Sequence, residues 1–369
     1  MSDCNARRLE VLRDTLSADG VDALLVASIP NVRYLTGFTG SAAALLLTRS
    51  RILVISDGRY TTQLRQECPD LEVHIRPIGQ PMAEGIAEVI GRLGIGRLAF
   101  EAMAVSVAEF ETLRQKLTVE LVGVQGRVEA LRMIKDPAEI AAIRAAIACA
   151  ETAFAMLCAG LKADDSEKDV ADALEMDLRR CGATAASFAP IVAVGPHSAL
   201  PHARPSAVTR LGSADFVLID WGADGAGYKS DLTRVLVTGK VSAQLERVYR
   251  CVLAAQERGI AMVRPGVRAR DVDAEVRSIL EDAGFGHFFS HGTGHGLGLE
   301  IHEAPMLRRE SEAVLQPGMV VTIEPGVYLP DWGGVRIEDD VLVTPDGHEV
   351  LSHVPKVLDA VVVGSRQEQ

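Results

Sequence analysis

The sequence lacks several features that would assign it to common classes of protein. No apolar run approaches the roughly 20 residues that a membrane-spanning helix requires, and the opening MSDCNARRLE has no apolar signal-peptide core. Basic residues are not in excess, because the 369 residues carry a formal net charge of −12. We therefore expect a cytoplasmic protein that binds neither membranes nor nucleic acid.

Several short catalytic and cofactor motifs are also absent. The chain has no G-x-S-x-G of a serine hydrolase, no G-x-G-x-x-G of a dinucleotide-binding domain and no Walker P-loop. No two cysteines form a C-x-x-C pair, so neither a zinc knuckle nor a thioredoxin-like site is indicated. We interpret the six cysteines as reduced, structural thiols. They are Cys4, Cys68, Cys149, Cys158, Cys181 and Cys251.

The first third of the chain alternates strand and helix patterns, in a protein whose length suggests two or three domains. Helices are expected at residues 7–19 and 83–93. Strands are expected at residues 21–28, 42–48, 51–56 and 97–101. Strands that alternate with helices are typical of an α/β domain.

The pattern changes near residue 130, where a long alanine-rich helix begins. Asp136 is expected as its N-cap and Pro137 as its first residue. Ser166 opens a second helix, with Asp169 as the acidic partner of the cap. Two strand regions follow these helices, at residues 187–194 and 215–237.

This order of elements recurs further along the chain. Helices are expected at residues 242–263 and 271–283, followed by strands at 320–323 and 335–343. We interpret the recurrence as an internal duplication with a period of roughly 100 residues. A cleft between the two duplicated halves is the expected place for a functional site.

Two aspartates flank a predicted hairpin in FVLIDWGADGAGYKSDLTRVLV, residues 216–237. If the turn centres between Gly225 and Ala226, Asp220 lies directly opposite Asp231, about 5 Å away. Two carboxylates at that distance repel strongly unless one binds a proton or a cation lies between them. The apolar run before Asp220 argues against a solvated strand residue, since buried unpaired carboxylates are costly.

The second half supplies glutamates at equivalent places. Glu324 ends an apolar run in VVTIEPGVYLPDWGGVRIEDDVLV, residues 320–343, at about one period after Asp220. Arg336, Glu338 and Asp340 alternate along a predicted strand and should share one face. Each half thus contributes carboxylates from corresponding strands.

Histidines are concentrated in the same part of the chain. Six of the nine lie there: His197, His202, His287, His291, His295 and His302. The segment SHGTGHGLGLEIHE, residues 290–303, contains four glycines, which predicts a loop or an irregular strand. A helical H-E-x-x-H zinc site is excluded, because Pro305 follows His302-Glu303 too closely. A cluster of imidazoles favours metal binding or proton transfer.

Four carboxylates and one imidazole suit Mn²⁺, Fe²⁺ or Co²⁺ better than a thiolate zinc site. The four carboxylates are balanced in charge by two divalent cations, whereas one cation would leave a negative excess. We therefore predict a two-metal site in which a bridging hydroxide is activated for hydrolysis. The candidate groups are Asp220, Asp231, Glu324, Glu338 and one histidine.

These residues resemble the motifs of the pita-bread metallopeptidases (peptidase family M24), which include Xaa-Pro aminopeptidase, Xaa-Pro dipeptidase (prolidase) and methionine aminopeptidase. The matching segments occur in the family's order: IDWGADGAGYKSDLTR, HGTGHGLGLEIHE, TIEPGVY and GGVRIEDD. The resemblance implies an α/β (α+β) fold in two domains. Residues 1–127 would form a creatinase/prolidase-like N-terminal domain, and 128–369 a pita-bread catalytic domain with a pseudo-twofold internal duplication.

The resemblance also implies a complete set of metal ligands. Asp231 and Glu338 would bridge both ions, and Glu324 would also act as the general base. The implied ligands are Asp220, Asp231, His295, Glu324 and Glu338. The ions would be Mn²⁺, with Co²⁺, Fe²⁺ and Zn²⁺ as alternatives.

Further residues are implied at the substrate. His291 and His302 would face it, and His202 would handle the tetrahedral intermediate. Tyr328 would line the site, and Arg336 would support Glu338 or the substrate. One of the histidines would pass a proton to the leaving nitrogen.

Among the activities of this family, we favour Xaa-Pro aminopeptidase, with Xaa-Pro dipeptidase as the alternative. The segments YLTGFTGS and DGRYTTQ favour the aminopeptidase, which removes the first residue from peptides with proline second. Methionine aminopeptidases generally lack such an N-terminal domain, and creatinase works without metal. A non-enzymatic binding protein on this fold would be favoured by degraded ligands, which are not seen. The resemblance further implies a homodimer.

Overall fold

The computed structural model describes residues 3–363 and divides the chain into two compact units, Met1–Arg132 and Met133–Gln369. Unit 1 is built on a six-stranded sheet in the order β4-β3-β2-β1-β5-β6. Its strands are β1 Ala23–Val26, β2 Ala44–Thr48, β3 Ile52–Asp57, β4 Glu72–Arg76, β5 Arg97–Glu101 and β6 Glu120–Val124. Its helices are α1 Asp3–Ala18, α2 Ile29–Thr36, α3 Thr61–Glu67, α4 Met82–Gly91, α5 Val107–Lys116 and α6 Glu129–Arg132.

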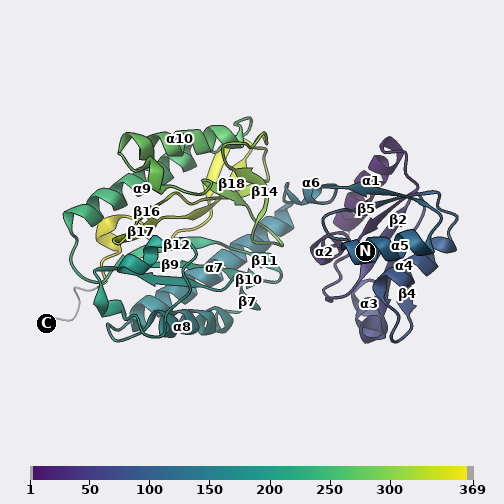
Figure 1. Ribbon diagram of the computed structural model, residues 1–369, viewed down its shortest axis with the longest axis horizontal. Helices are drawn as coiled ribbons and strands as arrows, with labels where there is room; N and C mark the ends of the chain where they lie inside the picture. The colour runs from purple at the N-terminus through teal and green to yellow at the C-terminus, as the bar shows by residue number, and fades with distance from the viewer. Residues whose placement is uncertain (1–2, 364–369) are drawn as a thin grey trace. The chain divides into compact units, whose positions relative to one another are not determined.

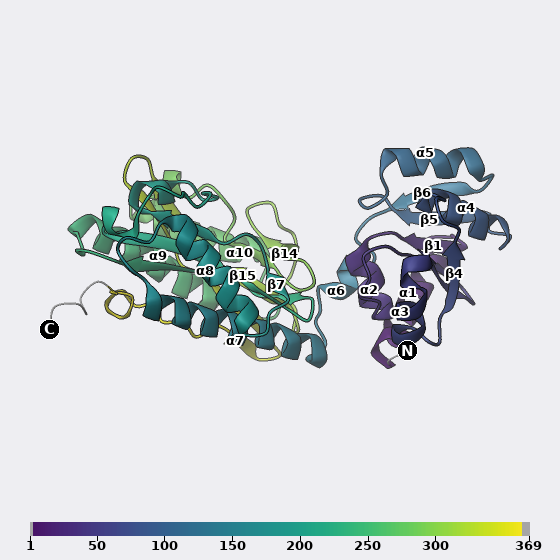
Figure 2. The ribbon, with the colours of Figure 1, turned by 90° about the horizontal axis from the view of Figure 1, so that it is seen from below.

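The sheet of unit 1 is mixed. β2 runs antiparallel to β1 and β3, while β5 runs parallel to β1 and β6. Apolar side chains of α4 and α5, among them Ile86 and Leu113, pack with Leu25 and Leu98 on one face of the sheet (Figure 2). The α/β domain that the alternating patterns predict is confirmed.

Unit 2 contains two long helices followed by strands, and then the same order again. The helices are α7 Pro137–Gly160 and α8 Glu167–Arg180 in the first half, and α9 Ala243–Met262 and α10 Ala269–Asp282 in the second. The strands of the first half are β7 Ala185–Ala186, β8 Ile191–Val194, β9 Phe216–Trp221, β10 Ala223–Gly225, β11 Tyr228–Lys229 and β12 Leu232–Val237. Those of the second half are β13 Gly294–Gly296, β14 Glu303–Leu307, β15 Val320–Ile323, β16 Gly326–Leu329, β17 Gly333–Arg336, β18 Asp339–Thr344 and β19 Gly347–Val350.

The helices of unit 2 lie outside its strands. In Figure 1, α8 lies below the strands and α9 and α10 lie above them. The main sheets have the orders β12-β9-β8 and β14-β13-β15-β18-β19, and an antiparallel bridge between Thr233 and Glu338 joins the halves. The sequence-based prediction of a repeated element order is therefore confirmed, and the two halves meet along strands that carry carboxylates.

Local signals determine where the helices of the first half begin. The side chain of Asp136 accepts hydrogen bonds from the backbone N–H groups of Ala138 and Glu139. The Glu139 carboxylate in turn accepts the backbone N–H of Asp136. Ser166 and Asp169 form the same reciprocal arrangement at the start of α8. Both predicted caps are confirmed, because a capping box depends only on residues three apart.

Helix α7 is long and apolar enough to cross a membrane, but it is a core helix of unit 2. It carries Glu139, Arg144 and Glu151, and Arg144 makes an ion pair with Glu349 of β19. On its buried face, Phe154 stacks on Trp221 with ring centroids 4.0 Å apart. The indole of Trp221 also donates to a backbone carbonyl of α7, at 3.0 Å. Burial in the unit therefore accounts for its apolar composition.

The predicted register of the aspartate hairpin is wrong by two residues. Asp220 lies opposite Thr233, not opposite Asp231. The turn is formed by Ala226 and Gly227, with φ angles of 52° and 88°, so its centre lies one residue later than expected. Two consecutive positive φ angles define the type I′ hairpin turn. A shift of two residues keeps both aspartates on one face, so their proximity is preserved.

The predicted strand over residues 335–343 is also wrong, because it is two strands with different partners. Arg336 of β17 pairs with Gly326, whereas Asp339 of β18 pairs with Ile323. The segment with which they pair is interrupted between β15 and β16 at Pro325, which has no backbone N–H to donate to a neighbouring strand. Glu338 falls at the resulting break and donates its backbone N–H to Thr233 instead.

Candidate metal centre

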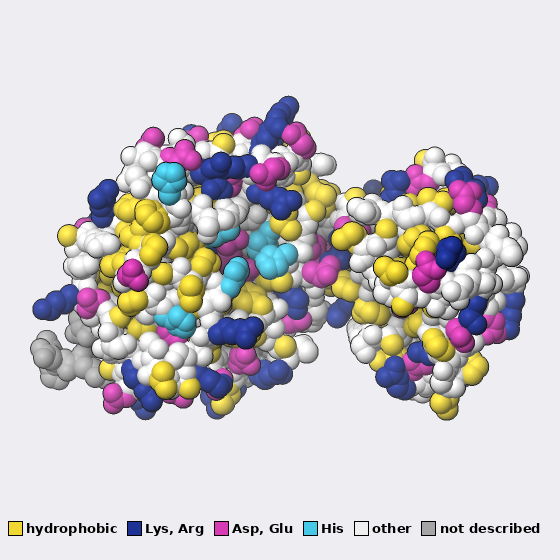
Figure 3. All heavy atoms as spheres, viewed as in Figure 1, with side chains coloured by type: hydrophobic (Ala, Val, Ile, Leu, Met, Phe, Trp, Pro, Cys, Tyr) yellow, Lys and Arg dark blue, Asp and Glu magenta, His cyan; other side chains and the backbone are white. Residues whose placement is uncertain are grey.

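A cavity of about 560 Å³ in unit 2 is lined by residues of both halves. It contains all five predicted metal ligands: Asp220, Asp231, His295, Glu324 and Glu338. His202, His291, His302 and Arg336 also line it, while Tyr328 lies behind them and bonds to His291 and Arg336. Figure 3 shows histidine and acidic side chains gathered on this face of unit 2. The structure therefore brings together every predicted site residue.

Strand ends and close backbone packing position these ligands. Asp220 lies near the end of β9, Asp231 precedes β12, and Glu324 follows β15. The strand that carries His295 passes between β14 and β15. A Cβ atom on Gly294 would lie 1.9 Å from the carbonyl oxygen of Thr322, so only glycine fits there. The glycines of the histidine segment thus serve close strand packing.

Three buried side chains offer ligand atoms to one point. Atoms of Asp231, His295 and Glu338 all lie within 4.8 Å of one another. The His295 Nε2 atom lies 3.6 Å from Asp231 Oδ2 and 3.5 Å from Glu324 Oε1. Its Nδ1 atom lies 3.0 Å from the carbonyl oxygen of Gly296, so Nδ1 carries the hydrogen. The lone pair of Nε2 therefore faces the carboxylates.

The protonation states of these groups fit a bound cation. Burial lowers the pKa of His295 to about 4, so the imidazole is neutral at neutral pH. A neutral nitrogen lone pair directed at carboxylates gains nothing from them, but it can share a cation with them. Imidazole and carboxylate ligands together suit a divalent first-row metal.

The pKa values of the carboxylates also fit a bound cation. Burial raises the pKa values of Asp231 and Glu338 well above the ordinary range, and neighbouring carboxylates raise them further. Burial also raises the pKa of Glu324 to about 7. Oδ1 of Asp220 is buried and has no hydrogen-bond partner among residues 3–363. Buried acidic groups in this state hold protons unless cations replace them, so the residues fit two divalent metal ions.

We expect the metal-free protein to lose stability as the pH rises from 5 to 8. Up to about pH 7 the folded chain keeps a proton on Glu324, whose pKa is about 7, and the pKa values of Asp231 and Glu338 are raised too, while unfolded carboxyl groups titrate near 4. These carboxyl groups hold more protons in the folded state than His291 and His295 lose on folding, so the free energy of unfolding falls with rising pH. In EDTA, the thermal midpoint should drop by roughly 5 °C or more. With Mn²⁺ bound the drop should nearly vanish, and a midpoint in EDTA that rises over this range would refute the expectation.

Arg336 organises the opposite side of the cavity. Its side chain is buried and donates to Asp220 Oδ2 at 2.5 Å and to the Tyr328 hydroxyl at 2.7 Å. The Tyr328 hydroxyl lies 2.9 Å from His291 Nε2, and His291 Nδ1 lies 2.8 Å from the Gly292 carbonyl oxygen. Burial lowers the pKa of His291 to about 4, so Tyr328 donates to a neutral ring. Both nitrogens of His291 are engaged, which favours a positioning role over proton transfer.

His202 and His302 are the histidines open to the cavity. Neither side chain makes a hydrogen bond within the described part of the chain, and both line the cavity. The ring of His302 lies 4.3 Å from that of His295, between centroids, and burial lowers its pKa. These two rings are available to a bound substrate.

Thr233 is a residue of the site that the sequence did not single out. Its hydroxyl donates to Glu338 Oε2 at 2.6 Å and accepts from Arg336 Nε at 3.1 Å. It therefore orients a predicted ligand on the other half of unit 2. The alternation of SDLTRVLV could have indicated it, since Thr233 shares a face with Asp231.

Comparisons with known proteins agree with this geometry. The description "Metallopeptidase family M24" matches residues 141–345, and "Creatinase/Prolidase N-terminal domain" matches residues 8–134. An uncharacterized peptidase of Bacillus subtilis, YqhT, is 40% identical over 352 residues, covering 95% of this chain and 99% of that protein.

Two solved structures are similar over nearly their whole length. A Xaa-Pro dipeptidase from Bacillus anthracis has a TM-score of 0.92 and 38% identity, covering 96% of this chain and 99% of that one. An X-Pro aminopeptidase from Thermotoga maritima has a TM-score of 0.84 and 35% identity, covering 92% and 97%.

Proposed function

The chain belongs to metallopeptidase family M24, and we propose that it is a metal-dependent Xaa-Pro dipeptidase, which splits dipeptides with proline in second position. The observation that carries the proposal is the cluster of three buried carboxylates (Asp220, Asp231 and Glu338) and the partly buried Glu324 beside the neutral His295, a donor set that fits two divalent cations. We propose Mn²⁺ as the metal, since it suits oxygen-rich sites. The preference for an aminopeptidase, drawn from the sequence, becomes the second candidate.

Two observations support the dipeptidase: the similarity to solved structures and the arginine side chains in the cavity. The similar dipeptidase structure has the higher identity and TM-score of the two. A dipeptide also presents a carboxylate, which a guanidinium binds well. Arg336 is engaged with Asp220 and Tyr328, but Arg204 and Arg308 line the cavity and are exposed. We propose that one or both of these two side chains bind the substrate carboxylate.

An aminopeptidase remains the second candidate because of one observation. The chain is 35% identical to the X-Pro aminopeptidase from Thermotoga maritima, over 92% of its length. The bond chemistry would be the same, and only the recognition of the prolyl carboxylate would differ.

The residues of the cavity would have three roles in hydrolysis: metal ligand, general base and proton donor. Asp220, Asp231, His295, Glu324 and Glu338 would hold the two ions, which supply an activated water and polarise the scissile carbonyl when bound. Glu324 would accept the proton of the attacking water, since burial raises its pKa to about 7. The proline nitrogen of the substrate carries no hydrogen, so it must receive a proton on leaving. His202 or His302, in the cavity wall, would relay to it the proton that Glu324 takes from the water.

We expect Mn²⁺-loaded protein to cleave Ala-Pro at least about tenfold faster, in kcat/KM, than Ala-Pro-amide or Ala-Pro-Ala. Loss of a hydrogen bond to a charged group costs on the order of 1.5–3 kcal/mol, which corresponds to this factor or more. Alanine release would be followed with all three substrates, and EDTA should abolish it.

Two controls make the assay decisive. Ala-Ala tests the requirement for proline, because it has the same charges around a secondary amide. Faster cleavage of Ala-Pro-Ala than of Ala-Pro would replace the dipeptidase by the aminopeptidase. If none of these peptides is cut with Mn²⁺, Co²⁺ or Zn²⁺, the proposed Xaa-Pro activity is wrong.

A further inference from the structure

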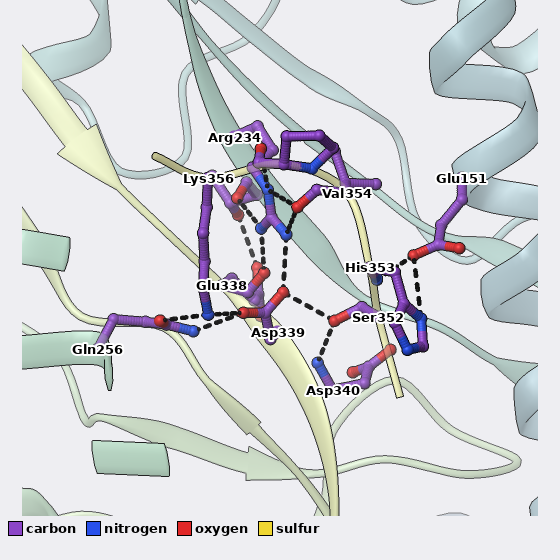
Figure 4. Close-up of polar contacts among 12 residues, drawn as sticks. Glu151, Arg234, Gln256, Glu338, Asp339, Asp340, Ser352, His353, Val354 and Lys356 are labelled. Carbon is purple, nitrogen blue, oxygen red and sulfur yellow. Dashed lines mark hydrogen bonds and ion pairs between the residues drawn. The ribbon is translucent and has the colours of Figure 1, made fainter. Parts of the chain in front are cut away.

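A buried ionic network lies directly behind the predicted ligand Glu338, and none of its members lines the cavity. Figure 4 shows Arg234 of β12 and Asp339 of β18 at its centre, with Lys356 reaching in from the C-terminal segment. Gln256 of α9 and Ser352 complete it. We call these five residues the brace.

Arg234 uses all of its donors within the brace and its surroundings. Its side chain is fully buried, at 0% exposure. Nη1 donates to the carbonyl oxygens of Glu338 at 2.5 Å and Thr233 at 2.9 Å. Nη2 and Nε donate to the carbonyl oxygens of Val354 and Pro355 and to Asp339. One guanidinium thus connects both halves of unit 2 to the C-terminal segment.

Asp339 is the anion of the brace, and both of its oxygens are occupied. Oδ1 accepts from Arg234 at 2.7 Å and from Ser352 at 2.8 Å. Oδ2 accepts from Gln256 at 2.8 Å and from Lys356 at 2.5 Å. Two cationic side chains thus bind a single carboxylate.

The brace holds the backbone at two predicted ligands. Arg234 holds the carbonyl of Glu338, whose backbone N–H is bound to Thr233 on the opposite strand. Ser352 accepts the backbone N–H of Asp340, and Asp340 Oδ2 accepts the backbone N–H of Asp231. The main chain at Glu338 and at Asp231 is therefore fixed from behind by side chains that never reach the cavity.

Stability by itself does not explain this arrangement. A buried ion pair can often be replaced by apolar residues of similar volume without loss of stability. Here Arg234 instead donates directly to the carbonyl of Glu338, and its carboxylate partner Asp339 is the next residue in the chain after that predicted ligand. Partners of metal ligands commonly govern metal affinity in this way.

We propose that Arg234 and Lys356, acting through Asp339, are positioning residues of the metal centre. They hold Asp231 and Glu338 at the separation that lets both share the ions. The proposal rests on the proposed metal centre but not on the identity of the substrate.

The test uses the full-length protein and the metal alone. Lys356→Met removes the partly exposed cation, and Arg234→Lys keeps the charge while losing the fork that binds the carbonyls. Arg144→Met is the matched control, because it breaks an exposed ion pair to β19 that has no link to the ligands. Mn²⁺ and Co²⁺ affinities would be measured by calorimetry, and the Co²⁺ visible absorption band would report the ligand geometry.

Both brace variants should bind metal about 10- to 100-fold more weakly and shift the Co²⁺ band, whereas Arg144→Met should match the wild type. Circular dichroism below the thermal midpoint would show that each variant is folded. If Arg234→Lys does not fold, Lys356→Met still decides the question. Wild-type affinity and an unchanged Co²⁺ band in folded Lys356→Met would overturn the proposal. A wild-type protein that binds metal but cleaves no Xaa-Pro peptide would refute only the proposed function.

Discussion

Asp231→Asn is expected to lower kcat/KM for Ala-Pro by at least about 10³-fold, which corresponds to roughly 4 kcal/mol of lost transition-state stabilisation. Asp231 is buried, and its carboxylate lies in the cluster that His295 and Glu338 share. Asparagine removes one negative charge and replaces an oxygen with an N–H₂ group that cannot bind a cation. Both ions should be bound more weakly, since Asp231 is the predicted bridge.

The same substitution should have the opposite effect on the metal-free protein. Burial and neighbouring carboxylates raise the pKa of Asp231 well above its ordinary range, so ionisation of the folded state is costly. The neutral asparagine avoids that cost. At pH 8 in EDTA, Asp231→Asn should therefore unfold at a higher temperature than the wild type. Greater stability with lost activity is the pattern expected of a functional residue.

Asp224→Asn is the control for this prediction. Asp224 lies on the same hairpin, pairs with Lys229 at 2.5 Å and does not line the cavity. It should keep wild-type activity and metal content. Asp231→Asn protein that retains kcat/KM within tenfold would remove Asp231 from the metal centre.

Glu324→Gln is expected to lower kcat by about 10²- to 10⁴-fold, the usual contribution of a general base. Glu324 Oε1 lies 3.5 Å from His295 Nε2, and its pKa of about 7 suits a group that accepts a proton near neutral pH. Glutamine keeps the size of the side chain but cannot accept a proton. The measurement is kcat with saturating Ala-Pro, together with metal content by elemental analysis.

Metal content separates the two predicted roles of Glu324. If the variant keeps both ions and loses kcat, Glu324 acts mainly as the base. If an ion is lost as well, its role as a ligand dominates. Glu281→Gln is the control, because Glu281 lies on α10, is largely exposed and does not line the cavity. Undiminished kcat in Glu324→Gln would contradict both roles.

Interactions between near neighbours made much of this fold predictable. The starts of α7 and α8 follow from Asp136 and Ser166, whose capping partners are three residues away. The strand at residues 97–101 follows from its short apolar run alone. The glycines around His295 predicted an irregular strand, and β13 has an irregularity between His295 and Gly296.

The hairpin register and the strand over residues 335–343 were predicted wrongly, because in each case the conformation of a single residue sets the pairing of a whole strand. Ala226 adopts a positive φ of 52°, which non-glycine residues seldom do, and this moved the hairpin centre. The break between β17 and β18 depends on Pro325, which lies between the neighbouring strands β15 and β16 and not in the segment that breaks. Patterns along one segment carry no information about such a partner.

Residue types and their spacing were enough to assign the family, the repeated order of elements and the donor set of four carboxylates and a histidine. These properties depend on residue type and on spacing along the chain. Three contacts could be seen only in the folded chain. Nε2 of His295 faces the carboxylates, and the Tyr328 hydroxyl is hydrogen-bonded to His291. Arg234 donates to the backbone carbonyl of Glu338. Arg234 and Glu338 are 104 residues apart in the chain. Contacts over such separations exist only after the two halves have packed, so no local pattern can specify them.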